Sequence, residues 1–240
     1  MNKIDINIET IRQKFRDKIE PSRWGHILNP IIDSDTFDSV IHNLKKLVEN
    51  GNRFTPVLGD IFNAFIHCPY DKFKAIFIGQ DPYPQLGVAD GISFSCSKTG
   101  KIQPSLRYIY SEIERQYPDI LMGDIYKKPD LKRWSEQGVL MLNTAFTVQI
   151  GKIGSHYDIW KPITNEILTK INDNFNNTPV ALLGKKAEEW ELKVNKQKIY
   201  KVPHPASAAY KGGKWDSKDL FKKINRHLID HNNHDPIIWL

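Results

Sequence analysis

Residues 74–84 read KAIFIGQDPYP, an apolar run that ends at a glycine and is followed by two polar residues and a Pro-Tyr-Pro turn. A short apolar run that is bounded by turn residues and rich in β-branched and aromatic side chains is typical of a strand buried on both faces. The same pattern recurs in GVLMLN at 138–143, PVALLG at 179–184 and QKIYKV at 197–202. The sequence therefore predicts four buried strands.

Helical patterns lie before and between these predicted strands. Apolar residues recur at helical spacing in segments 8–19, 37–48, 105–116, 159–175 and 220–228. Because strands and helices alternate along the chain, the sheet should be mainly parallel. The predicted fold class is α/β, with a central four-stranded mainly parallel sheet flanked by helices. No repeat or long linker divides the chain, so residues 1–240 are expected to form a single domain that includes the N-terminal helices within 1–55.

Composition and charge narrow the classes of function. The 240 residues include 34 Lys and Arg against 28 Asp and Glu, a net charge of +6, which suits a phosphate-rich partner. The two cysteines, Cys68 and Cys96, are too few for a disulfide framework or a four-thiolate cluster. No apolar run approaches the roughly 20 residues of a membrane span, and residues 1–20 do not resemble a targeting peptide. We expect an intracellular protein, cytoplasmic or nuclear, with no membrane partner.

Polar residues stand at the carboxyl ends of three predicted strands. Gln80 and Asp81 follow the first strand, Asn143 ends the second and His204 follows the fourth. In a parallel sheet these ends share one edge, where reactive groups gather. An Asp-Pro-Tyr sequence is often only a turn, and a lone histidine is often a plain surface or core residue. A carboxylate and an imidazole at two strand ends are nevertheless a candidate catalytic pair that would face one crevice.

Several longer motifs in the sequence resemble those of one known family. Residues 79–95, GQDPYPQLGVADGISFS, resemble the water-activating motif of the classical, family 1, uracil-DNA glycosylases. Residues 204–207, HPAS, resemble a shortened form of that family's His-Pro-Ser-Pro-Leu loop. Further matches follow in the family's order at 60–65 (DIFNAF), 104–106 (PSL), 138–143, 155–156 (SH), 183–184 (LG) and 236–239 (PIIW). The resemblance thus spans most of the chain, and it implies an enzyme that flips uracil out of DNA and hydrolyses its N-glycosidic bond.

The resemblance implies roles for the residues at the strand ends. Asp81 would position the attacking water and stabilise the cationic sugar, while His204 and the backbone near Gln80 would donate hydrogen bonds to uracil O2. Because the leaving uracil is stabilised as an anion, neither a metal nor another cofactor is expected. A polar helix end accounts better than a metal site for the C-terminal histidines, His227, His231 and His234. The two cysteines also disfavour the iron-sulfur branches of the glycosylases.

Three further residues would recognise the base. Phe94 would stack on uracil, which is worth about 1 to 3 kcal/mol and does not select among bases. Asn143 would read the O4 and N3 edge, so that cytosine would leave mismatched buried groups at roughly 1 to 3 kcal/mol each. Tyr83, anchored between two prolines, would fill the space that the 5-methyl group of thymine needs. The resemblance therefore implies selectivity for uracil over both pyrimidines of normal DNA.

The candidate DNA contacts are Ser105, Lys185, Ser207 and Tyr210. Ser105 and Ser207 would bind phosphate, and Lys185 stands where the family usually has a serine, so its contact should be more salt-sensitive. The family's apolar wedge is missing from residues 206–208, and Tyr210 either replaces it by stacking or is a loop-packing aromatic residue. A weak wedge would favour single-stranded substrate, because extrusion from a duplex costs roughly a few kcal/mol.

The expected partner is uracil-containing DNA, single- or double-stranded, bound by a monomer. A proteinaceous inhibitor or a replication protein is a further expected partner. Pro84 departs from the histidine that the family usually has after Asp-Pro-Tyr, which should make catalysis slower. An alternative is a glycosylase-fold binding or scaffold subunit of a replication complex with weak or no catalysis. The joint presence of the catalytic pair and the three base-recognising residues argues against that alternative.

Overall fold

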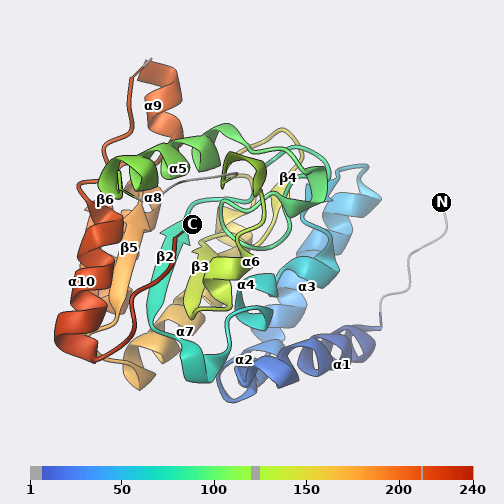
Figure 1. The fold of residues 1–240 in the computed structure, drawn as a ribbon. Coiled ribbons are helices and arrows are strands. Elements are labelled where there is room, and N and C mark those ends of the chain that lie inside the picture. The colour runs from blue at the N-terminus through green and yellow to red at the C-terminus, as the bar shows by residue number, and fades with distance from the viewer. Residues whose placement is uncertain (1–6, 120–124, 212, 240) are drawn as a thin grey trace.

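The four predicted strands form one parallel sheet at the centre of the molecule (Figure 1). The computed structural model describes residues 7–119, 125–211 and 213–239. The strands lie side by side in the order β3 (Val139–Asn143), β2 (Ala75–Gly79), β5 (Pro179–Leu183) and β6 (Lys198–Val202). All neighbouring strands run parallel, so the predicted α/β fold with a central four-stranded sheet is confirmed.

The register of the sheet brings the carboxyl ends of the strands to one edge. Gly79 of β2 pairs with Asn143 of β3, and on the other side of the sheet Leu183 of β5 pairs with Val202 of β6. Because these pairs are the last residues of their strands, the loops that follow all start at the same edge. The sheet therefore provides the edge at which the polar strand-end residues were expected to meet.

Alternate strand residues contribute to two hydrophobic cores, one on each face of the sheet. Ile76 and Ile78 of β2 belong to the first core, whereas Ala75 and Phe77 belong to the second. The first core is covered by α1 (Ile8–Ile19), α2 (Gly25–Ile32), α3 (Asp35–Glu49), α4 (Asn63–Ile66), α7 (Tyr157–Asn174) and α8 (Lys185–Glu188). The second is covered by α5 (Pro104–Gln116), α6 (Lys132–Ser135), α9 (Ala206–Lys211) and α10 (Leu220–Asn232). The strands β2, β3 and β5 are buried along their whole length, which explains why they read as continuous apolar runs. The edge strand β6 is buried only at Val202, so the prediction that it is a buried strand is wrong.

The ends of the long helices follow local sequence signals. The Ser34 side chain accepts a hydrogen bond of 3.2 Å from the Phe37 backbone nitrogen and so caps α3, and serine is a preferred residue at this position. Pro104 begins α5, where its missing N–H costs nothing. The helix α2 was not predicted, because it has only eight residues and contains Pro30, which normally disfavours a helix interior. Its four buried residues, Ile27, Leu28, Ile31 and Ile32, show that packing stabilises it.

Short elements connect the main layers. A two-stranded antiparallel sheet joins β1 (Phe54–Thr55) to β4 (Val148–Gln149), and strands this short have no detectable sequence period. Single 3-10 turns occur at η1 (Glu20–Ser22), η2 (Leu58–Asp60), η3 (Tyr70–Lys72), η4 (Ser97–Thr99), η5 (Ile125–Lys127) and η6 (Glu191–Val194). In the described ranges, no helix has the length and apolar character that crossing a membrane requires.

Candidate active site

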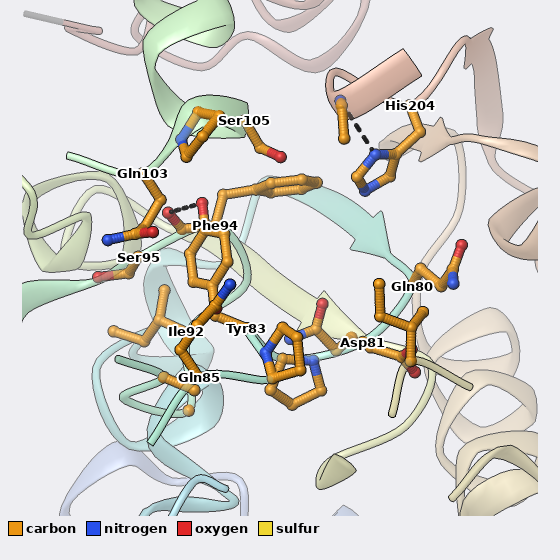
Figure 2. A pocket seen from close by; sticks show the side chains of 18 of the residues that line it. Gln80, Asp81, Tyr83, Gln85, Ile92, Phe94, Ser95, Gln103, Ser105 and His204 are labelled. Carbon is orange, nitrogen blue, oxygen red and sulfur yellow. Dashed lines mark hydrogen bonds between the residues drawn. The ribbon is translucent and has the colours of Figure 1, made fainter. Parts of the chain in front are cut away.

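A cavity of about 520 Å³ opens at the carboxyl edge of the sheet (Figure 2). Asp81, from the loop after β2, and His204, from the loop after β6, both line it. The cavity is also lined by the other residues that were predicted to contact the base, namely Gln80, Tyr83, Phe94 and Asn143. The expectation that a carboxylate and an imidazole face one crevice is therefore met by the geometry.

The Asp81 carboxylate is fixed through one oxygen. The backbone nitrogen of Gly154 donates a hydrogen bond of 2.6 Å to Asp81 Oδ2. The other oxygen, Oδ1, is buried and makes no hydrogen bond to any described residue. Burial raises the pKa of Asp81 above its ordinary value, and the Gly154 hydrogen bond acts in the opposite direction. The carboxylate is thus oriented, with one acceptor oxygen left for a molecule in the cavity.

The His204 ring is held as one neutral tautomer. Its Nδ1 accepts a hydrogen bond of 3.2 Å from the backbone nitrogen of Ala206, so the proton of the neutral ring resides on Nε2. Burial lowers the pKa of His204 to about 4, which keeps the ring uncharged at neutral pH. Gly184 makes this placement possible, because a Cβ atom there would lie 2.8 Å from the Cβ of His204. The cavity therefore receives a neutral imidazole that can donate one hydrogen bond from Nε2.

Phe94 is presented by a tightly bonded loop. Its φ of 63° lies in the left-handed region, which is rare for an aromatic residue and must be maintained by the surroundings. The buried carboxylate of Asp90 accepts hydrogen bonds from the backbone nitrogens of Ile92 (3.1 Å) and Ser97 (3.0 Å). It also accepts from the hydroxyls of Ser95 and Ser97, both at 2.6 Å. The Phe94 and His204 rings lie with centroids 5.6 Å apart (Figure 2).

Asn143 and Ser93 form a polar pair in the wall formed by the strands. The Ser93 hydroxyl donates a hydrogen bond of 3.0 Å to Asn143 Oδ1. A Cβ atom on Gly79 would lie 2.4 Å from Ser93 Oγ and 2.8 Å from Asn143 Oδ1, so only glycine leaves room for this pair. The hydrogen bond fixes the direction of the amide, and its Nδ2 group remains available as a donor. Ser93 was not identified from the sequence.

Two further bonds shape the loop that carries Asp81. The Tyr83 hydroxyl donates a hydrogen bond of 3.1 Å to the Phe94 carbonyl oxygen, and burial raises the pKa of Tyr83 well above its ordinary value, so the phenol stays protonated. The Gln80 carbonyl oxygen accepts from the Thr144 hydroxyl at 2.8 Å, which joins the ends of β2 and β3. Tyr83 is therefore a rigid part of the wall.

The predicted DNA contacts are not all placed alike. Ser105, in the first turn of α5, and Ser207, in α9, both line the cavity. Lys185 is exposed at the start of α8 and is not among the lining residues. The prediction for the Tyr210 side chain falls outside the part of the chain that the structure describes. Of the three predicted DNA contacts whose side chains the structure describes, Ser105 and Ser207 line the cavity and Lys185 does not.

Two neighbours of the site, Tyr157 and His156, had no assigned role in the sequence analysis. The Tyr157 ring packs against Gly154, since a Cβ there would lie 3.4 Å from its Cε2, and burial followed by the charge of Asp81 raises the pKa of Tyr157. His156 is buried, its Nδ1 lies 2.9 Å from Thr147 Oγ1, and burial lowers its pKa to about 4. Tyr157 is revealed only by its spatial position beside Gly154 and Asp81, whereas His156 belongs to the Ser155-His156 pair already quoted from the sequence. Among the described residues there is no cluster of three or more side chains that could hold a metal ion.

Comparisons with known proteins agree with this geometry. The family model for the uracil DNA glycosylase superfamily matches residues 65–229. A uracil-DNA glycosylase of Dichelobacter nodosus is 36% identical over 225 residues, covering 92% of this chain and 95% of the relative. One of Borrelia duttonii is 38% identical over 219 residues, covering 90% and 96%.

Solved structures show the same fold. The crystal structure of mimivirus uracil-DNA glycosylase matches with a TM-score of 0.80 and 24% identity, covering 98% of this chain and 89% of that one. A single-residue variant of mimivirus UNG in complex with UGI matches with a TM-score of 0.83 and 25% identity, covering 99% and 92%. The family model and the curated relatives confirm the family resemblance found in the motifs, and the solved structures show that the fold is shared over nearly the whole chain.

Proposed function

This chain belongs to the uracil-DNA glycosylase superfamily, and we propose that it is a DNA repair enzyme that flips uracil out of DNA and hydrolyses its N-glycosidic bond, leaving an abasic site. The observation that carries the proposal is that Asp81 and His204 line one cavity from the ends of two different strands. A cavity of about 520 Å³ is large enough for a pyrimidine nucleotide. The enzyme is a hydrolase of N-glycosyl bonds.

The two residues suit the charges that develop as the bond breaks. The sugar becomes positive and the leaving uracil becomes negative, so the reaction needs an anion on one side and a hydrogen-bond donor on the other. We assign the first role to Asp81, whose unpartnered Oδ1 also accepts a hydrogen bond from the attacking water. We assign the second to His204, whose neutral ring donates from Nε2 to uracil O2. Water supplies hydroxide to C1′, and the uracil anion takes up a proton after it leaves.

Base recognition is assigned to the walls of the cavity. Phe94 stacks on the base, with its backbone already held by the Asp90 hydrogen bonds. Asn143 donates from Nδ2 to O4, because its Oδ1 already accepts from Ser93. Tyr83 excludes thymine sterically, since its hydroxyl is anchored on the Phe94 carbonyl and the ring cannot swing away without losing that bond.

The assigned DNA contacts lie around the mouth of the cavity. Ser105 and Ser207 line it and are proposed to hold the phosphates beside the extruded nucleotide, and Lys185 adds a charge contact. The net charge of +6 favours binding to either single- or double-stranded DNA. A proteinaceous inhibitor is a further proposed partner, because the related mimivirus protein is found in complex with UGI. An intracellular location follows from the proposed substrate.

The decisive experiment measures release of free uracil from oligonucleotides that contain one deoxyuridine. Purified protein should release uracil from single-stranded and duplex DNA without added metal, and it should leave matched oligonucleotides containing thymine or cytosine intact. Binding to DNA without release from either substrate would contradict the proposal and would favour a scaffold role. A comparison of the two substrates also measures how much extrusion from the duplex limits the rate.

A further inference from the structure

Ile153 is an exposed apolar residue in the rim of the cavity. Seven large hydrophobic side chains are exposed among the described residues, and Ile153, at 60% exposure, is the one of them that lines the cavity. Single exposed hydrophobic residues are common on protein surfaces and need no function. The position of Ile153, not its exposure alone, is therefore what calls for an explanation.

The loop that carries Ile153 is fixed to the loop that carries Asp81. Two residues before Ile153, the backbone nitrogen of Gly151 donates a hydrogen bond of 3.0 Å to the Pro84 carbonyl oxygen. Immediately after it, Gly154 donates its hydrogen bond of 2.6 Å to Asp81 Oδ2. The side chain of Ile153 thus projects from a short segment that is anchored on both sides. Such a segment loses little conformational entropy when it binds a partner.

The position of the loop indicates which part of a DNA substrate Ile153 would contact. In the proposed complex Asp81 faces the sugar of the extruded nucleotide, so the residue next to Gly154 lies on the sugar side of the mouth. The strand enters and leaves the cavity there, and its neighbouring bases have lost a stacking partner. Lys152, exposed on the same loop, provides a positive charge for a nearby phosphate. The loop therefore offers an apolar tip beside a cation.

We propose that Ile153 is a wedge that enters the base stack beside the extruded uridine and keeps the strand open. The proposal rests on the uracil-excision function proposed above. Proteins that unstack or kink DNA frequently insert a branched or aromatic apolar side chain, isoleucine among them, between two bases. Insertion buries the exposed side chain against base faces, and that burial offsets part of the cost of unstacking.

The test compares single-stranded with duplex substrate in matched variants. Ile153→Ala should lower kcat/KM on duplex DNA by about fiftyfold, because three buried carbon groups are lost, and should change it less than twofold on single strands. Ile153→Leu should restore most of the duplex activity. Leu192→Ala, which truncates a more exposed residue in η6 that does not line the cavity, should match the wild type on both substrates.

A fluorescence measurement detects the wedge directly. Duplex DNA with 2-aminopurine next to deoxyuridine should brighten on binding to Asp81→Asn protein, which is used to prevent cleavage, and should brighten much less with the Asp81→Asn, Ile153→Ala double variant. Equal losses on the two substrates, or unchanged fluorescence in the double variant, would overturn the wedge while leaving uracil excision intact. Wild-type protein that releases no uracil would instead remove the underlying function, and the wedge with it.

Discussion

Gly154 and Asp81 are joined by a hydrogen bond of 2.6 Å from the glycine nitrogen to Oδ2, while Oδ1 of the same carboxylate is buried with no hydrogen bond among the described residues. The bond sets the direction of the carboxylate, and the second oxygen remains available for the reaction. A buried carboxylate with one unpartnered oxygen is unfavourable for stability. The site therefore exchanges some folding free energy for a reactive group in a fixed position.

Asp81→Asn should lower the rate of uracil release by orders of magnitude and raise the melting temperature at neutral pH. Burial raises the pKa of Asp81, so the ionised form destabilises the folded state at any pH above the folded pKa. The stability gain in the variant should shrink as the pH falls through that value. Release assays and thermal unfolding measure the two effects. The control Asp119→Asn, which alters an exposed carboxyl, should change neither the rate nor the melting temperature. A lower melting temperature in Asp81→Asn than in the wild type would contradict the interpretation that the buried carboxylate is destabilising.

His204→Gln should reduce the acid sensitivity of the fold. The pKa of His204 is lowered from 6.5 to about 4 in the folded state, so only the unfolded state binds the proton between these values. Stability is therefore lost as the pH falls from 6.5 towards 4. His156 contributes in the same direction and remains in the variant. Urea unfolding at several pH values should show a shallower loss in His204→Gln than in the wild type, and parallel curves would disprove the assignment.

Ser93→Ala should weaken base recognition without unfolding the protein. The change removes the hydrogen bond that directs the Asn143 amide, and a bond of this kind is worth about 1 kcal/mol, or roughly fivefold in kcat/KM on uracil. Discrimination against cytosine should also fall, because the amide is free to rotate. Competition assays with uracil and cytosine oligonucleotides measure both quantities. Ser111→Ala, on the exposed face of α5, serves as the control.

Gly184→Ala should damage the site more than the fold. Gly184 has a φ of +92°, and an added Cβ would lie 2.8 Å from the Cβ of His204. Gly51→Ala is the matched control, since Gly51 has a φ of +81° but no atom within 4 Å of the point where a Cβ would lie. Both variants should lose about 1 kcal/mol or more of stability through backbone strain. Only Gly184→Ala should also lose most of its kcat, and equal activities would refute a positioning role for this glycine.

Lys185→Ala should reduce the salt dependence of DNA binding. Each phosphate contact changes the slope of log affinity against log salt by about 0.9 on duplex DNA and about 0.7 on single strands. Titrations at several salt concentrations with Asp81→Asn protein measure the slope without cleavage. The control Lys14→Ala in α1 also removes one positive charge, at a position distant in sequence from Lys185, and should leave the slope nearly unchanged. An unaltered slope in Lys185→Ala would remove Lys185 from the phosphate contacts.

The sheet and the catalytic edge could be predicted because they depend on strong local signals. Three of the strands, β2, β3 and β5, are buried and continuously apolar, and parallel pairing places the residues that follow all four strands on one side. Ser34 and Pro104 likewise mark the starts of helices with local chemistry. The helix α2 was missed because its stability comes from tertiary burial, which outweighs the local effect of Pro30.

The supporting contacts of the site could not be predicted, because they join residues that are far apart in sequence. Gly154 reaches Asp81 across 73 positions, and Ser93 reaches Asn143 across 50. A glycine or serine alone gives no signal of such a contact. The same holds for Gly184, whose lack of a side chain leaves room for the Cβ of His204 from another strand end.

The hydrogen bonds that Asp90 makes with the loop around Phe94 also have a consequence after the reaction. Since these bonds hold the loop and the Phe94 ring in place in the free protein, affinity for the flat pyrimidine ring does not depend on an intact nucleic-acid chain. Free uracil should therefore bind to the empty enzyme and slow later turnovers as it accumulates. Product release, as well as bond cleavage, then limits the rate of repair.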